Sequence, residues 1–413
     1  MTSLQHSNVG FVGPYGSANL GDYGILINDI YDLHCNHITV FSYNYNWPKV
    51  QLDAYCTEIQ VDYCVVQVKE NYFFDGAIYK YSEDAILNGC RNLDEVIRYV
   101  KAIDVLIISG GGWINSFWAY RTEKIAKIAT IIYLAKSLNK PIRFMTQGLG
   151  PLGEFAEWYK SLFEGVNATV PVRDKQSLVV ANRELKLSAK WCPDDLLIPN
   201  QRWDNFKSVL APIETPYVLI EPFVPMENLK NNADMIGYFS RMFYEWYGCR
   251  LFYMPFDLVH FGNEQAQYCS SLSAYADYYD ISSDLFPKFE DVLALINGAD
   301  FVITGRYHGL VLALSCAIPV IHIVNDICGE YGANKAYSIV EWCFANGGGS
   351  LFCAGSLLDA FVKLETQYKT IRAEQIGLYN SVAYTNNITK AKAIRQSLLR
   401  DTIMSLLCAN KSR

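Results

Sequence analysis

The sequence lacks a long uninterrupted apolar segment, and we expect no secretory leader at its start. Its longest apolar stretch follows Gly309 and is broken by Pro319, so it is too short to span the hydrocarbon core of a bilayer. The first residues, MTSLQHSNVG, contain no basic segment followed by an apolar core, which argues against a secretory leader. We therefore expect a cytoplasmic protein. Peripheral contact with the inner face of the membrane stays open as an alternative for the basic, amphipathic segment Ile388–Leu407.

Closely paired cysteines and long basic clusters are also absent. Twelve cysteines are scattered along the chain without a C-x-x-C pair, so neither a zinc site nor a disulfide framework is indicated, and we expect no metal. The formal net charge is -7, and no long run of Lys and Arg occurs, which argues against a nucleic-acid partner. An anionic small molecule would instead need a local basic pocket.

What the sequence does contain is an alternation of apolar strands and helices, present in both halves. A chain of 413 residues exceeds the usual size of one hydrophobic core, and periodicity is lost between Pro199 and Pro216, which marks the best linker. We expect a Rossmann-like domain over residues 1–203, a second over 204–380, and a C-terminal helix over 381–413 that packs back across both. The expected fold class is α/β, with parallel sheets facing across a cleft.

One stretch, ADFVITGRYHGLVLALSCAIPVI, reads as a strand, a turn, a buried helix and a second strand. Its turn carries Arg306, Tyr307 and His308, and the helix is expected from Gly309 onward. In a parallel sheet such a turn lies at the carboxyl edge, where ligands bind. A fixed bidentate cation beside a group that titrates near neutral pH suits an acidic substrate. The alternative is that Arg306 and His308 only cap the helix.

A second strand–loop–helix unit opens the chain. A short strand ends near Gly13, and a helix is expected to follow with Asp22 as its N-cap. The loop between them would form a nest for anions or sugar hydroxyls, into which Asn19 and Asp22 would point. The glycine spacing, which includes Gly21, does not match the dinucleotide fingerprint G-x-G-x-x-G.

Other predicted strands of the first half also end in residues typical of ligand sites. Gly110, Gly111 and Gly112 follow the strand DVLIIS, where they would let a ligand approach the backbone closely, or would serve a tight turn. Gln147 and Arg173 follow two further strands. The pair Asp194 and Asp195 is more typical of a turn and cap than of a metal site.

The ordered motifs ANLGDYGIL, IISGGGWIN, TQGLGPL, PVRDKQSL, CPDDLLI and ITGRYHGLVLALSCAIPVI resemble those of the polysaccharide pyruvyl transferase family over nearly the whole chain. The resemblance implies a GT-B-like arrangement of two Rossmann-type domains. It implies transfer of the enolpyruvyl unit of phosphoenolpyruvate to two sugar hydroxyls, forming a cyclic pyruvate ketal and phosphate, as in exopolysaccharide or capsule biosynthesis. No cofactor is implied beyond phosphoenolpyruvate, the donor substrate.

The residues present suit that chemistry. Arg306 and Arg173 are the expected donor-binding cations, and His308, with Asp22 as a second candidate, is the expected acid or base. The family usually has Leu where this chain has Tyr307, and it carries a lysine after the next strand, for which the nearest here is Lys335. The expected substrate-binding set is Arg306, Arg173, Tyr307, Asn19, Gly21, Gly110, Gly111, Gly112, Gln147 and Lys335.

The acceptor is left open. We expect a sugar on the side of the first domain, carried as a nucleotide sugar, a lipid-linked oligosaccharide or a finished polymer, with phosphoenolpyruvate on the second domain. One competing function is a GT-B glycosyltransferase that uses a nucleotide sugar. Another is a non-catalytic sugar-binding protein, which would keep the aromatic residues without needing Arg306 and His308. The sequence does not specify an oligomeric state.

Overall fold

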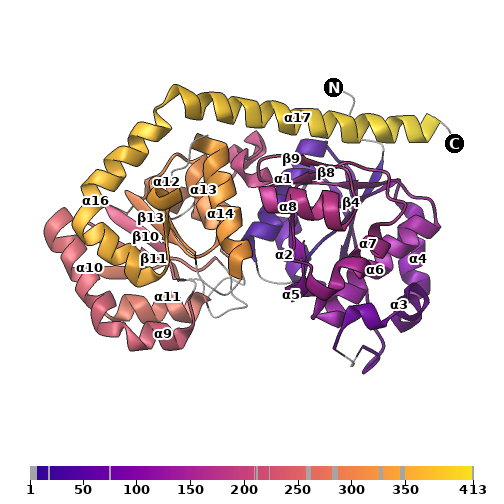
Figure 1. The fold of residues 1–413 in the computed structure, drawn as a ribbon, viewed down its shortest axis with the longest axis horizontal. Coiled ribbons are helices and arrows are strands. Elements are labelled where there is room, and N and C mark those ends of the chain that lie inside the picture. The colour runs from indigo at the N-terminus through magenta and orange to yellow at the C-terminus, as the bar shows by residue number, and fades with distance from the viewer. Residues whose placement is uncertain are drawn as a thin grey trace. The chain divides into compact units, whose positions relative to one another are not determined.

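The computed structural model describes residues 7–16, 19–73, 76–208, 210, 213–222, 224–256, 262–280, 287–324, 329–344 and 349–411, without the side chains of 329–334 and 405–411. The chain forms two compact units. The first contains Met1–Ser17, Asp22–Asp195 and Lys392–Arg413, and the second contains Ala18–Gly21 and Leu196–Ala391. Figure 1 shows strands enclosed by helices in each unit.

The main sheet of the first unit has five parallel strands in the order β3-β2-β1-β4-β6. Its strands are β1 (Asn8–Val12), β2 (His37–Ser42), β3 (Gln60–Val65), β4 (Val105–Ile108) and β6 (Ile142–Phe144). The strand order reverses between β1 and β4, so the chain leaves these two neighbours toward opposite faces of the sheet. In open α/β sheets this switch point, at the carboxyl ends of the strands, is where ligands bind.

A second, four-stranded parallel sheet of the first unit was not predicted as a separate sheet. Its order is β5-β7-β8-β9, with β5 (Gly111–Ile114), β7 (Gln147–Leu149), β8 (Val170–Val172) and β9 (Ala189–Trp191). Two of its strands begin just after the ends of β4 and β6. The glycine and glutamine segments that the sequence places at strand ends therefore lie between two sheets.

The second unit has a six-stranded parallel sheet in the order β12-β11-β10-β13-β14-β15. Its strands are β10 (Tyr217–Glu221), β11 (Arg250–Tyr253), β12 (Ala276–Tyr278), β13 (Phe301–Thr304), β14 (Val320–Ile323) and β15 (Cys353–Ala354). The order reverses between β10 and β13. Parallel sheets with helices in both units confirm the predicted α/β class.

The helices of the first unit are α1 (Leu20–Leu33), α2 (Asn46–Tyr55), α3 (Glu83–Gly89), α4 (Leu93–Ala102), α5 (Ser116–Ala119), α6 (Thr122–Ser137), α7 (Ala156–Phe163) and α8 (Lys175–Val179). Those of the second are α9 (Met226–Asn231), α10 (Ala233–Tyr247), α11 (Gly262–Ser271), α12 (Phe289–Gly298), α13 (Tyr307–Ser315), α14 (Gly329–Phe344), α15 (Gly349–Phe352) and α16 (Leu357–Tyr379). Each unit has its own core of apolar strand and helix residues, because a parallel sheet is covered on both faces.

Two helices begin earlier than the sequence suggests. α1 begins at Leu20, so the prediction that Asp22 is its N-cap is wrong, and Asp22 instead lies in the first turn. A carboxylate there still interacts favourably with the helix dipole. α13 begins at Tyr307 rather than Gly309, and Arg306 is its N-cap residue. Tyr307 and His308 are therefore first-turn residues of a helix.

The last helix, α17 (Val382–Lys411), is grouped with the second unit through residue 391 and with the first unit from residue 392. In the second unit, Tyr384 donates a hydrogen bond to the backbone oxygen of Leu314 at 2.7 Å. In the part of the chain that the structure describes, no helix combines the length and apolar character needed to cross a membrane.

Candidate active site

The carboxyl edge of the second sheet gathers polar residues at its switch point. Glu221 ends β10, Thr304 ends the neighbouring strand β13, and Arg306 follows two residues later. The Thr304 hydroxyl accepts a hydrogen bond from the Arg306 backbone N–H at 3.1 Å, which fixes the turn. The strands thus carry these side chains to the place where ligands of open α/β sheets bind.

Arg306 is held by a buried carboxylate. Its Nε lies 3.3 Å from Oε1 of Glu221, whose side chain is 6% exposed, while the Arg306 side chain is 17% exposed. The Thr304 hydroxyl donates to the same carboxylate at 3.3 Å. Glu221 was not predicted from the sequence, although a charged residue at the end of an apolar strand is a signal that could have identified it. Glu221 orients the guanidinium at the edge of the sheet.

The residue after Arg306, Tyr307, contributes an aromatic ring that contacts a cation and a histidine. The Lys335 ammonium, on α14, is 5.5 Å from the centroid of the Tyr307 ring, which suits a cation–π interaction. The Tyr307 and His308 rings are 5.5 Å apart at 68°, an edge-to-face pair. Lys335 is only 8% exposed. The structure therefore brings together four of the predicted residues: Arg306, Tyr307, His308 and Lys335.

His308 is packed against the first turn of α1. A Cβ added to Gly21 would lie 1.8 Å from His308 Nδ1, so only glycine leaves room for the imidazole. This turn is held by the Asn19 side chain, whose Oδ1 accepts from the Gly21 N–H at 3.0 Å, and by the Leu20 N–H, which donates to the Phe256 carbonyl at 3.3 Å. Asn19 and Gly21 thus have a role in shaping the surroundings of His308.

His322 also belongs to this region but was not predicted. It lies in β14, which pairs with β13 so that Thr304 and His322 are partners in register. The side chain is buried, and no hydrogen-bond partner of its Nδ1 occurs among the described residues. Burial, and then the nearby Lys335 charge, lowers the pKa of His322 to about 4. A polar residue inside the apolar run PVIHIV was the available signal.

In the first unit, Asp22 lies at the glycine-rich end of β4. Gly111 has φ +113°, and a Cβ on it would lie 3.3 Å from Asp22 Oδ1. Gly110 is required for packing, because a Cβ there would lie 2.8 Å from Ile25 Cγ2 and 2.9 Å from the Thr146 oxygen. Gly112 follows in β5. We call Asp22 with Gly110–Gly112 the glycine corner.

Two other predicted binding residues are buried and interact with neighbouring protein groups. Gln147 is fully buried, and its Nε2 donates to the carbonyls of Ile108 and Met145 at 3.0 and 2.9 Å. Arg173 is 3% exposed, and its NH1 pairs with Asp194 at 3.0 Å. Removing one partner of such a buried pair costs about 3–5 kcal/mol. These residues join strand ends within the first unit, and any role in binding stays a prediction.

The final helix contributes a buried cation to the first unit that sequence analysis missed. Arg395 pairs with Asp29 at 3.0 Å, with Asp32 at 2.6 Å, and with Asp195. Asp29 in turn accepts from the Ser109 hydroxyl at 2.8 Å, next to the glycine corner. Burial raises the pKa of Asp195 to about 6 against the lowering effect of Arg395. Nothing local in the sequence signals this contact across the chain.

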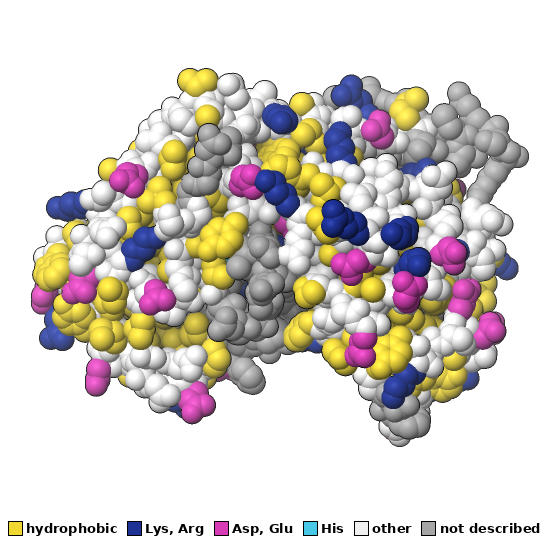
Figure 2. Space-filling model, in the orientation of Figure 1, with side chains coloured by type: hydrophobic (Ala, Val, Ile, Leu, Met, Phe, Trp, Pro, Cys, Tyr) yellow, Lys and Arg dark blue, Asp and Glu magenta, His cyan; other side chains and the backbone are white. Residues whose placement is uncertain are grey.

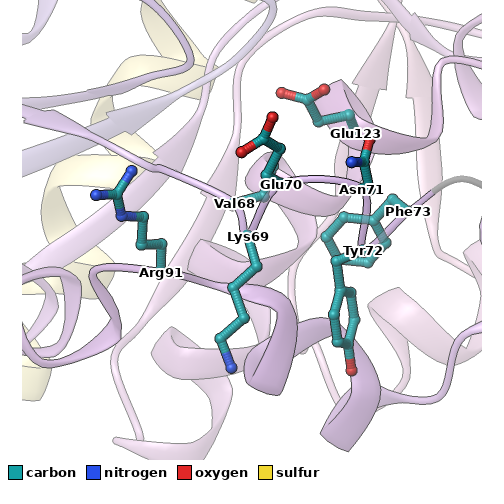
Figure 3. Close-up of a pocket in the computed structure, with 8 residues that line it drawn as sticks. All are labelled: Val68, Lys69, Glu70, Asn71, Tyr72, Phe73, Arg91 and Glu123. Atoms are coloured by element: carbon teal, nitrogen blue, oxygen red, sulfur yellow. The ribbon is translucent and has the colours of Figure 1, made fainter.

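A separate cavity of about 480 Å³ lies in the first unit, lined by Val68, Lys69, Glu70, Asn71, Tyr72, Phe73, Arg91 and Glu123. In Figure 3 the Lys69 and Arg91 side chains extend in different directions, and the Glu70 carboxylate points to the side opposite the Lys69 ammonium. None of the predicted site residues lines this cavity. In the part of the chain described, no group of three or more His, Cys, Asp or Glu could hold a metal ion.

Comparison with solved structures shows that the fold is GT-B-like. UDP-GlcNAc 2-epimerase from Neisseria meningitidis, bound to UDP-GlcNAc, matches with a TM-score of 0.58 and 12% identity, over 95% of this chain and 99% of that one. Alr3699/HepE from Anabaena, in complex with UDP and glucose, matches with a TM-score of 0.56 and 12% identity, over 95% and 99%. At such identities the likeness establishes the fold alone.

Comparisons of sequence, unlike those of structure, identify the family. A search of curated proteins finds no significant match. The model of the family described as polysaccharide pyruvyl transferase matches residues 41–327, which include the glycine corner except Asp22 and all of the Arg306–His308 turn. The chain therefore belongs to the polysaccharide pyruvyl transferase family.

Proposed function

We propose that the protein transfers the enolpyruvyl unit of phosphoenolpyruvate to two hydroxyls of a sugar, giving a cyclic pyruvate ketal and phosphate. The observation that carries this proposal is the group of Arg306, Tyr307, His308 and Lys335 at the switch point of the second sheet. Arg306, Lys335 and His308 all lie within the second unit. Glu221 pairs with Arg306, and the small size of Gly21 leaves room for His308.

Phosphoenolpyruvate presents a carboxylate and a phosphate close together. Arg306 offers a rigid fork that suits either anion, and Lys335 offers a point charge next to the Tyr307 ring. The N–H groups at the start of the nine-residue helix α13 add a favourable dipole for a negative group. We place the donor here for these reasons, with Tyr307 as the side wall. Arg173 has a less direct part, because Asp194 already balances its charge.

The reaction needs proton transfer but no redox partner. The enol carbon C3 gains one proton, C2 becomes oxocarbenium-like, and the two sugar oxygens form bonds to C2 as its bond to the phosphate oxygen breaks. Of the two hydroxyl protons released, one balances the proton gained at C3 and the other leaves with phosphate. A histidine can deliver and accept protons near neutral pH, so we assign this role to His308.

The glycine corner of the first unit is the proposed acceptor side. Asp22 is a carboxylate that can accept a proton from an attacking hydroxyl, and the glycine backbone allows a sugar to approach closely. The acceptor sugar is supplied as a nucleotide sugar, a lipid-linked oligosaccharide or a polymer, and no cofactor is required.

A second candidate is a glycosyltransferase that uses a nucleotide sugar, favoured by the fold shared with proteins solved with UDP-GlcNAc or UDP. The two functions predict different products. Purified protein is incubated with phosphoenolpyruvate and a panel of sugars, and separately with nucleotide sugars and the same panel. Phosphate release with an acceptor mass gain of one pyruvate less water supports pyruvyl transfer. Release of nucleotide without release of phosphate would indicate glycosyl transfer instead of pyruvyl transfer.

A further inference from the structure

The first unit exposes aromatic rings together with cations just beyond the glycine corner. Phe117, on α5, is 55% exposed. The Arg121 guanidinium carbon lies 4.4 Å from the Phe117 ring centroid and 5.2 Å from that of Trp118. Figure 1 places α5 at the lower edge of its unit, and Figure 2 shows hydrophobic side chains at the surface in that region. Exposed aromatic surface of this kind is typical of binding sites.

A second cation joins this surface from α6. Lys124 Nζ lies 5.2 Å from the Tyr43 ring centroid and 6.0 Å from that of Trp118. Burial, and then the charges of Arg121 and Lys127, lower the pKa of Lys124. We call Tyr43, Phe117, Trp118, Arg121 and Lys124 the aromatic–cation platform.

Two acidic side chains near the platform have partners of their own, and the charge of Glu123 also acts on Lys124, where it opposes the lowering of the pKa. Glu123 pairs with Lys127 at 2.8 Å, and Glu154 accepts a hydrogen bond from Tyr120. Among the described residues, neither Arg121 nor Lys124 forms an ion pair. A half-buried ammonium beside other cations gains free energy when an anion arrives, because the anion offsets both desolvation and repulsion.

The platform is continuous with the glycine corner. The Tyr43 hydroxyl donates to the Pro14 carbonyl at 3.1 Å. Pro14 Cγ would lie 3.3 Å from a Cβ on Gly111, the same distance as Asp22 Oδ1. One proline therefore separates Tyr43 from the corner where the acceptor hydroxyls are proposed to react, so a molecule longer than one sugar could contact both.

We propose that the aromatic–cation platform binds the acceptor as an anionic saccharide, an inference that rests on the proposed function. A sugar ring packs on the exposed face of Phe117, since aromatic rings cover the apolar faces of sugars. Its negative group, a phosphoryl or a carboxylate, is bound by Arg121 and Lys124. The net charge of -7 makes such a local basic surface the feature that selects a charged acceptor.

Direct binding tests the platform without turnover. Calorimetric titrations use glucose 1-phosphate, a glucuronate-containing disaccharide and neutral cellobiose. The proteins are wild type, the double variant Arg121→Gln/Lys124→Gln and the control Lys160→Gln, which changes a partly exposed cation on α7. We expect a charged probe to bind wild type and the control, and to bind the double variant at least about tenfold more weakly. The charged probe that binds identifies the group as phosphoryl or carboxylate. No binding of either charged probe, or equal binding to all three proteins, overturns the proposal.

Kinetics separate this proposal from the proposed function. With an acceptor that supports phosphate release, Phe117→Ala and the double variant should raise the KM for acceptor about tenfold while the KM for phosphoenolpyruvate stays unchanged. If turnover occurs and the acceptor KM does not move, the platform is wrong and pyruvyl transfer stands. If charged probes bind through Arg121 and Lys124 but no acceptor releases phosphate, the platform stands and pyruvyl transfer is wrong.

Discussion

The imidazole of His308 lies directly against the backbone of Gly21, so that a Cβ added to Gly21 would come 1.8 Å from Nδ1. Two motifs separated by most of the chain, ANLGD and GRYHG, are therefore complementary in shape. The glycine is required here for space, since its φ lies outside the left-handed region.

Replacing Gly21 with alanine should displace the imidazole and lower kcat by about 10²-fold or more, similar to losing a general acid or base. The control is Gly377→Ala, because that helical glycine has nothing within 4 Å of an added Cβ. Steady-state phosphate release and circular dichroism check the prediction. In the double variant Gly21→Ala/His308→Ala the two effects should not add, because both act through one ring. Additive losses would show that Gly21 acts independently of His308.

Arg306 and His308 should affect different kinetic constants. His308→Ala should chiefly lower kcat, by about 10²–10⁴-fold. Arg306→Lys keeps the charge but loses the fork and the Nε contact with Glu221, so it should raise the KM for phosphoenolpyruvate sharply. Initial rates with phosphoenolpyruvate varied distinguish the two. An unchanged kcat with a raised KM in His308→Ala would make His308 a binding residue and leave Asp22 as the acid–base candidate.

Stability should depend on pH through His322. Its pKa falls from an ordinary value of 6.5 to about 4, so between these pH values the unfolded chain binds more protons than the folded chain. The contribution of His322 to the free energy of unfolding is therefore fully present above pH 6.5 and is lost as the pH falls toward 4. The loss is roughly 2 kcal/mol between pH 7 and pH 5. Denaturant unfolding of wild type and His322→Gln at both pH values measures this difference. An identical pH dependence in both proteins would contradict the prediction.

Arg395 should stabilise the first unit. Arg395→Met leaves the carboxylates of Asp29, Asp32 and Asp195 close together without their cation, which should lower the free energy of unfolding by about 3–5 kcal/mol. Arg400→Met is the matched control, because Arg400 is exposed on the same helix. Thermal unfolding followed by circular dichroism compares them. Equal melting temperatures for both variants would show that the three carboxylates do not depend on Arg395.

The switch-point group was predictable because its chemistry is local in sequence. Arg306, Tyr307 and His308 lie in one turn between apolar elements, and parallel-sheet geometry fixes where such a turn lies. The start of α13 at Tyr307 was missed because glycine marked the expected boundary at Gly309. The position of this boundary depends on the hydrogen bond from the Arg306 N–H to the Thr304 hydroxyl, and a sequence pattern does not show such a bond.

Contacts between distant segments could not be predicted from patterns. Glu221 and Arg306 are brought together only by the pairing of β10 with β13, and Arg395 reaches Asp29 across most of the chain. Arg173 was predicted to bind the donor, but it is buried against Asp194. A polar residue at a predicted strand end does not reveal which partner its side chain will meet. A structural charged residue is distinguished from a binding one by its burial and its charge partner, and neither can be deduced from the residue type.

In the proposed reaction, phosphoenolpyruvate donates its three-carbon unit and a proton is added at C3. Nuclear magnetic resonance of the product formed from phosphoenolpyruvate and acceptor in D₂O tests it most directly. We expect a ketal whose methyl group carries one solvent-derived deuterium, formed by wild type and lost with His308→Ala. Unchanged phosphoenolpyruvate in the presence of an acceptor that the same protein glycosylates from a nucleotide sugar would contradict it.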